Sequence, residues 1–158
     1  MKHFSLKATP LAAAAMGLIA FAFTSCDSSE GKTGALSNWT NKGTAVGGTE
    51  ISVQAGDTLL TPGNYTNFEL TGQAYTEPGA TSALLFHTHD GKGGYEVLFS
   101  NGAIDGTTKT GSLTSVRNLY SSLAKDGDWC DFSMAVRGKN IAVSINGVDV
   151  VCYTEPDA

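Results

Sequence analysis

The residues from His87 to Glu96 carry the strongest candidates for chemistry in this sequence. His87 and His89 close one run with strand character, Asp90 follows them, and Tyr95 and Glu96 open the next run. A hairpin between these runs brings imidazole and carboxylate groups within a few residues of each other. If its register pairs residue 87 with residue 96, His87 and Glu96 are cross-strand neighbours and the candidate catalytic acid–base pair.

Plainer interpretations of these residues stay open. His87 and His89 occupy alternate strand positions and point the same way, which makes them weak candidates for divalent-metal ligands, since no third spaced ligand is visible. A divalent metal is the only cofactor that the sequence suggests. His87 is otherwise a structural residue at a strand end, and Glu96 is otherwise a solvent-facing residue.

A second group of candidates lies in and beside the weakly patterned stretch 101–128. Its charged, amide and aromatic side chains suit the binding of a polar substrate. In the plainer interpretation, Arg117 pairs with Asp126 or Asp128 and Trp129 belongs to the core. The candidate substrate-binding residues are Tyr95, Lys109, Arg117, Asn118 and Trp129.

Strands must position these side chains. After Gly34 no stretch has a convincing helical period, whereas several alternate between apolar and polar residues and end at Gly, Asn or Asp. Residues 115–125 are predicted as a short helix or a long loop. Many short strands without helices indicate an all-β sandwich. The predicted strands are Glu50–Gln54, Asn67–Thr71, Ser82–Thr88, Tyr95–Ser100, Trp129–Arg137, Asn140–Asn146 and Val148–Tyr153.

The last three predicted strands form a meander, because Gly138-Lys139 and Asn146-Gly147 are two-residue turn signals. Regular hairpins place Cys130 and Cys152 about six residues apart along the strands, roughly 20 Å at ~3.3 Å per residue. A disulfide needs Cα atoms within about 7 Å. We therefore predict two buried free thiols.

The N-terminal residues have the layout of a secretory signal peptide. Lys2 and Lys7 precede an apolar run from Leu11 to Phe23, which is shorter than the roughly 20 residues of a membrane-spanning helix. The segment Phe23-Thr24-Ser25-Cys26 is interpreted as a lipobox, with Cys26 as the site of lipidation. The plainer interpretation is ordinary cleavage near Ser25, which leaves a free Cys26. We predict an exported protein, lipid-anchored to the bacterial envelope in the periplasm or on the outer-membrane surface.

The chain thus divides into a leader (1–25), a flexible tether (26–35) and one β-sandwich domain (36–158). Loss of the two leader lysines takes the formal net charge from −5 to −7. An acidic domain without basic clusters is not a nucleic-acid-binding protein. We expect the domain to contact the membrane through the N-terminal lipid only.

An ordered set of segments resembles the 3-keto-disaccharide hydrolase family over most of residues 36–156. The segments are Asn67-Phe68-Glu69-Leu70, Leu84-Leu85-Phe86-His87-Thr88, Gly94-Tyr95-Glu96-Val97-Leu98, Lys109-Thr110-Gly111-Ser112-Leu113, Arg117-Asn118-Leu119-Tyr120, Gly127-Asp128-Trp129, Val136-Arg137-Gly138-Lys139-Asn140-Ile141, Ile145-Asn146-Gly147 and Tyr153-Thr154-Glu155-Pro156. The resemblance implies a concanavalin A-like, jelly-roll sandwich in an exported or lipid-anchored protein. Because the family usually continues past the last segment, we expect the closing strand or strands to be missing.

The resemblance also implies a reaction, the cleavage of oxidised (3-keto) glycosides. A base removes the C2 proton, the C1 aglycone leaves by elimination, and water adds back. His87 and Glu96 are the candidate base and acid, and Arg117 or Lys109 is the candidate cation at the enolate oxygen.

Two other functions remain open on the same fold. One is a non-catalytic carbohydrate-binding module that uses aromatic residues such as Tyr95, Tyr120 and Trp129. The other is a truncated, inactive relative. Glycan binding by such a module would survive the loss of His87 and Glu96.

Overall fold

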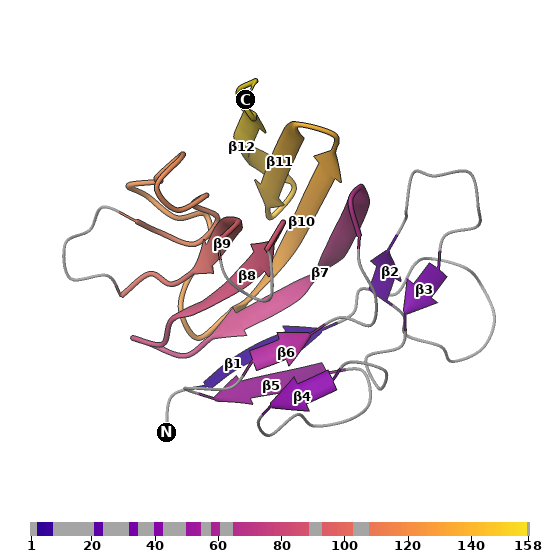
Figure 1. The fold of residues 1–158 in the computed structure, drawn as a ribbon. Coiled ribbons are helices and arrows are strands. Elements are labelled where there is room, and N and C mark those ends of the chain that lie inside the picture. Colours follow the sequence, from indigo (N-terminus) through magenta and orange to yellow (C-terminus); the bar gives the residue numbers. More distant parts are fainter. Residues whose placement is uncertain are drawn as a thin grey trace.

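The computed structural model describes residues 3–7, 21–23, 32–34, 40–42, 50–54, 58–60, 65–88, 93–102 and 108–157. Every regular element among them is a β-strand (Figure 1). The strands are β1 (His3–Lys7), β2 (Phe21–Phe23), β3 (Lys32–Gly34), β4 (Thr40–Lys42), β5 (Glu50–Gln54), β6 (Thr58–Leu60), β7 (Phe68–Thr76), β8 (Ser82–Phe86), β9 (Tyr95–Phe99), β10 (Trp129–Arg137), β11 (Asn140–Ile145) and β12 (Val148–Thr154). In these ranges no helix is long and apolar enough to cross a bilayer.

Two layers of strands enclose the core, and the pairs β2–β3 and β4–β6 are separate two-stranded sheets. The larger sheet has six strands in the order β12-β11-β10-β7-β1-β5, and each neighbouring pair is antiparallel. The β8–β9 hairpin crosses the face of β7 and β10 (Figure 1). Backbone hydrogen bonds join β9 in turn to residues 111–114, with Val97 opposite Leu113. The predicted all-β sandwich of the concanavalin A-like, jelly-roll type is confirmed.

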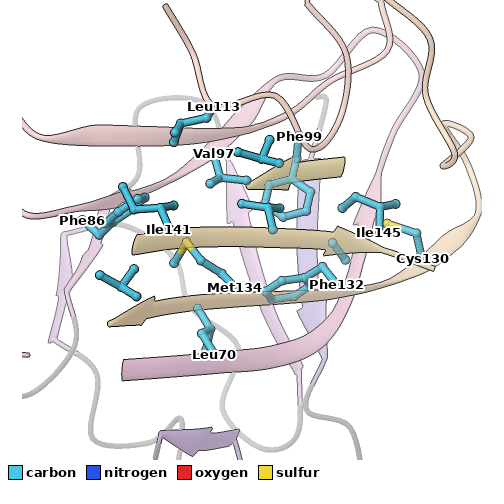
Figure 2. Packing of buried hydrophobic residues seen from close by; sticks show 14 of the residues in the cluster. Leu70, Phe86, Val97, Phe99, Leu113, Cys130, Phe132, Met134, Ile141 and Ile145 are labelled. Atoms are coloured by element: carbon cyan, nitrogen blue, oxygen red, sulfur yellow. The ribbon is translucent and has the colours of Figure 1, made fainter. Parts of the chain in front are cut away.

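The core lies between the six-stranded sheet and the hairpin layer, as Figure 2 shows. Alternate residues of β10 and β11 face it, so the period-two pattern of the sequence is the burial pattern of the strands. From the hairpin layer, Val97, Phe99 and Leu113 pack down on the sheet, each at most 1% exposed. The Phe99 and Phe132 rings meet edge to face with centroids 5.4 Å apart, which ties the two layers together.

Strand β7 is longer than the sequence predicts. β7 continues to Thr76 instead of ending at Thr71, because its second half pairs with β10 and places Gly72 and Ala74 in the core opposite Phe132 and Cys130. A glycine suits position 72 because the large ring of Phe132 lies across the ladder from it. The stretch 115–125 consists of turns and bends, so of the two predicted alternatives the loop is confirmed.

A β-bulge in the β11–β12 hairpin shifts the register of the chain. Ser144 pairs with Asp149, yet the preceding residue Val143 pairs with Val151, so Val150 is an extra residue in β12. From Val151 onward every side chain therefore faces the opposite side from the one that a regular hairpin gives. Both cysteines are free as predicted, but Cys152 is exposed and not buried, because the bulge turns it to the outer face beside Ala142.

Strand β1 falls within the residues predicted to form the leader. It lies between β7 and β5 in the six-stranded sheet and is hydrogen-bonded to both. Because β5 and β7 are each antiparallel to β1, they run parallel to one another.

Candidate active site

His87 stands at the point where β8 leaves the ladder. The β8–β9 register pairs Phe86 with Tyr95 and Leu85 with Glu96, two residues away from the predicted pairing of 87 with 96. His87 has a φ of 52°, in the left-handed region, and this turns the chain out of the strand. His87 and Glu96 are therefore not cross-strand neighbours, and the predicted acid–base pair does not form in this structure.

The partner of His87 is Glu155 instead. Nδ1 of His87 lies 3.3 Å from Oε1 of Glu155, and the two side chains are 23% and 22% exposed. Nε2 lies 3.3 Å from the carbonyl oxygen of Thr66. Both of these partners are hydrogen-bond acceptors, so only the doubly protonated imidazolium donates to both at once. The imidazole ring is thus held between a carboxylate and a backbone carbonyl.

The bulge in β12 brings Glu155 to His87. Tyr153 pairs with the buried Ile141 and faces the core side of the sheet, and Glu155, two residues further, follows the same face. The backbone N–H of Glu155 donates to the carbonyl of Lys139 at 2.8 Å, which fixes the end of the chain next to the β10–β11 turn. Without the extra residue Val150, these side chains would point to the outer face of the sheet.

Tyr95 connects the hairpin to this end of β12. Its ring stacks on Phe86 with centroids 5.6 Å apart and lies 6.0 Å from the ring of Tyr153. Burial, followed by the negative charge of Glu155 and hydrogen bonds with Tyr153 and Glu155, raises the pKa of Tyr95 to about 12. The phenol therefore stays protonated at neutral pH and can donate a hydrogen bond to a developing oxyanion.

Glu96 lies on the other side of the hairpin. Alternation along β9 puts Tyr95, Val97 and Phe99 toward the core, so Glu96 faces away from it. Its Oε1 accepts a hydrogen bond from Oγ1 of Thr114 at 3.2 Å. Glu96 is partly exposed there and does not share a face with Tyr95.

Lys109 lies at the far end of β9. Its Nζ donates to the carbonyl oxygen of Asn101 at 2.8 Å, and Nδ2 of Asn101 donates to Oδ1 of Asp126 at 2.8 Å. Six residues separate Tyr95 from Asn101, roughly 20 Å at ~3.3 Å per residue of extended chain. The structure does not bring Lys109 to the His87 end.

Arg117 and Asn118 lie on the segment that covers the hairpin. The backbone of Arg117 bridges to that of Leu113, and its side chain is exposed. Asp126, one of the aspartates expected to pair with it, accepts from Asn101 instead. Oδ1 of Asn118 is buried and has no hydrogen-bond partner among the described residues.

Trp129 opens β10 on the outer face of the large sheet. It pairs with Tyr75, their ring centroids are 5.5 Å apart, and 37% of Trp129 is exposed. The interpretation of Trp129 as a core residue is therefore wrong. Eight residues of β10 separate Trp129 from Arg137, roughly 26 Å at ~3.3 Å per residue, so Trp129 and His87 belong to opposite ends of the sandwich.

Sequence reasoning missed the roles of Tyr153 and Glu155. Both residues stand in the Tyr-Thr-Glu-Pro segment that carried part of the family resemblance, and this was the available signal. Among the described residues, no three His, Cys, Asp or Glu gather into a metal-binding group. His89, the second metal candidate, and Cys26, the lipidation candidate, lie outside the residues that the structure describes.

A comparison with protein families assigns the chain to a family. Residues 26–158 match the 3-keto-alpha-glucoside-1,2-lyase-like domain. The chain belongs to this family. No curated protein and no solved structure matches it in the corresponding searches. Membership in the 3-keto-alpha-glucoside-1,2-lyase-like family indicates a carbohydrate substrate and a lyase- or hydrolase-type activity, and the His87 end is the described site whose groups suit that chemistry.

Proposed function

We propose that this protein cleaves 3-keto-glycosides at the His87 end of the sandwich. The reaction removes the C2 proton, forms the C1–C2 double bond as the C1–O bond to the aglycone breaks, and then adds water for net hydrolysis. The observation that carries the proposal is the hydrogen bond of the His87 imidazole to the Glu155 carboxylate beside a protonated Tyr95.

Because of the substrate's own chemistry, a single basic residue is sufficient to begin the elimination. A ketone at C3 acidifies the neighbouring C2–H bond because the anion left behind is an enolate. Ordinary glycosidases instead use two carboxylates that flank C1. At the His87 end, Glu155 is the carboxylate in contact with the imidazole, which favours elimination over the two-carboxylate scheme.

Each group at this end has a role in the proposal. Neutral His87 donates from Nδ1 to Glu155 and takes the C2 proton on Nε2, which turns from the Thr66 carbonyl to the substrate. The carboxylate stabilises the imidazolium that results, and the imidazolium returns the proton to the leaving oxygen. The Tyr95 hydroxyl donates to the enolate oxygen at C3.

The test follows aglycone release from a 3-keto-glucoside and from its unoxidised parent. We expect release from the keto compound alone, a loss of about 100-fold or more in His87→Ala, and a smaller loss in Glu155→Gln, because general-base catalysis contributes roughly 10²- to 10⁴-fold. Asp157→Asn is the matched control, since this carboxylate lies at the same end but is 98% exposed and pairs with Lys139. Full turnover in folded His87→Ala would overturn the assignment, and Glu96→Gln reports whether the second candidate carboxylate takes part.

Export and anchoring belong to the same proposal. The family match begins at residue 26 and leaves the leader outside the domain, which supports processing in front of Cys26 and attachment of lipid to that residue. Incorporation of labelled fatty acid into the protein tests it.

A further inference from the structure

The outer face of the large sheet carries a second set of groups, away from the His87 end. In β10, Phe132 and Met134 face the core, so Trp129, Asp131 and Ser133 face outward. The register of β7 places Tyr75, Gln73 and Thr71 directly opposite these three residues. One face therefore has an aromatic pair, an amide–carboxylate pair and a hydroxyl pair in successive rows about 6.6 Å apart.

The first two rows are ordered by contacts across the strands. Trp129 and Tyr75 lie with ring centroids 5.5 Å apart at an angle of 47°, and Trp129 remains 37% exposed. In the next row, Nε2 of Gln73 donates to Oδ1 of Asp131 at 2.9 Å. The backbone N–H of Asp131 donates to Oδ1 of Asn146, which holds the row against the β11–β12 turn.

The surface beyond these rows is hollowed. A shallow depression of about 280 Å³ is lined by Thr71, Asp131, Phe132, Ser133, Ser144 and Gly147. Most of these side chains are small and polar, so the surface is recessed there toward the backbone of the sheet. From Trp129 to Ser133 the face extends about 13 Å at ~3.3 Å per residue, a length that suits a disaccharide unit.

We propose that this outer face binds a neutral oligosaccharide, independently of the reaction at His87. A sugar ring offers an apolar C–H face to an aromatic platform and hydroxyl groups to planar amide and carboxylate groups, and the two rows supply these partners in that order. The carboxylate of Asp131 and the acidic charge of the chain, −5 overall, disfavour anionic glycans. In this proposal the outer face holds the protein on a glycan, while the His87 end carries out the reaction on its sugar substrate.

Isothermal titration calorimetry of the full chain with maltotetraose and cellotetraose tests this proposal without any turnover. We expect at least one of the two tetrasaccharides to bind. We expect Trp129→Ala to weaken its affinity about tenfold or more, because tryptophan side chains at a contact supply a large share of the binding free energy. Gln73→Leu weakens it as well, without removing the aromatic pair. Leu85→Ala is the matched control, a 54% exposed apolar residue on the hairpin layer, and keeps wild-type affinity.

The outcomes separate this inference from the proposed reaction. Tight binding that His87→Ala leaves unchanged and Trp129→Ala removes supports the outer face. No binding of either tetrasaccharide, or binding that survives both Trp129→Ala and Gln73→Leu in folded protein, overturns it. Aglycone release from the keto substrate is measured separately, so either proposal can fail while the other stands.

Discussion

The β8–β9 hairpin that carries His87 and Tyr95 depends on one glycine. Gly94 has a φ of +80°, and a Cβ added to it would lie 2.3 Å from the carbonyl oxygen of Phe86 and 2.8 Å from that of His87. Contacts under 3.0 Å essentially never occur for a real Cβ, so the backbone must give way. Its neighbour Gly93 has a similar φ of +67°, but a Cβ there meets no atom of the described residues within 4 Å, which makes it a matched control.

The magnitudes follow from this geometry. In Gly93→Ala, the left-handed conformation costs about 1–2 kcal/mol, partly offset by the lower entropy of the unfolded chain, for a net loss of about 1 kcal/mol. Gly94→Ala adds the opening of the Phe86–Tyr95 rung, one or two hydrogen bonds of about 1 kcal/mol each, for a total of about 3 kcal/mol. The difference of about 2 kcal/mol corresponds to roughly 5–10 °C in Tm for a domain of this size.

Thermal and urea unfolding followed by circular dichroism measure both variants. We expect Gly94→Ala to unfold well below Gly93→Ala and to lose aglycone release, because the shifted rung moves His87 and Tyr95. Equal stability of the two variants, within about 0.5 kcal/mol, would refute the register of the hairpin and with it the placement of His87 beside Glu155.

Two further predictions concern alkaline stability and lipidation. Folding raises the pKa of Tyr95 from 10.0 to about 12, so the stability that the protonated phenol contributes is complete below pH 10 and is lost as the pH rises to 12. We expect the free energy of unfolding in urea to fall less steeply over this pH range in Tyr95→Phe than in the wild-type protein. An equally steep fall in both would contradict the burial of the phenol. Burial raises the pKa of Cys130 to about 11 in the same range, so the comparison is made in a Cys130→Ala background. Labelled palmitate should enter the wild-type protein in bacterial cells and not Cys26→Ala, and equal labelling of the two would reject Cys26 as the acceptor.

Local sequence signals were sufficient for much of the sandwich. β10 and β11 were predictable because Phe132, Met134 and Val136 alternate with smaller or polar residues and because Asn146-Gly147 specifies a tight turn. The second half of β7 was not predictable in this way. Gly72 and Ala74 have little strand preference, and pairing with β10 determines their conformation.

The candidate site was predictable only in its individual residues. His87 and Tyr95 stood out by type and by their place at a hairpin, but their partner depended on two long-range features without a local signature. The hairpin register leaves His87 outside the ladder, and the extra residue Val150 turns Glu155 toward it. A bulge arises from the fit of a whole strand against its neighbours, so no short segment announces it.

If the chain is exported as proposed, strand β1 constrains the order in which it is exported and folds. Its residues pair along both edges with β7 and β5, so a leader folded into the sheet is not accessible to a translocation channel or a peptidase. With processing at Cys26 as proposed, the chain must be exported before its sheet closes, and folding and secretion compete for the same five residues, His3–Lys7. After processing, β5 and β7 face a gap one strand wide, about 9.6 Å between them at ~4.8 Å per strand. They can then join only as a parallel pair or accept another strand antiparallel to both, so the mature sheet is not the precursor's sheet with a piece removed.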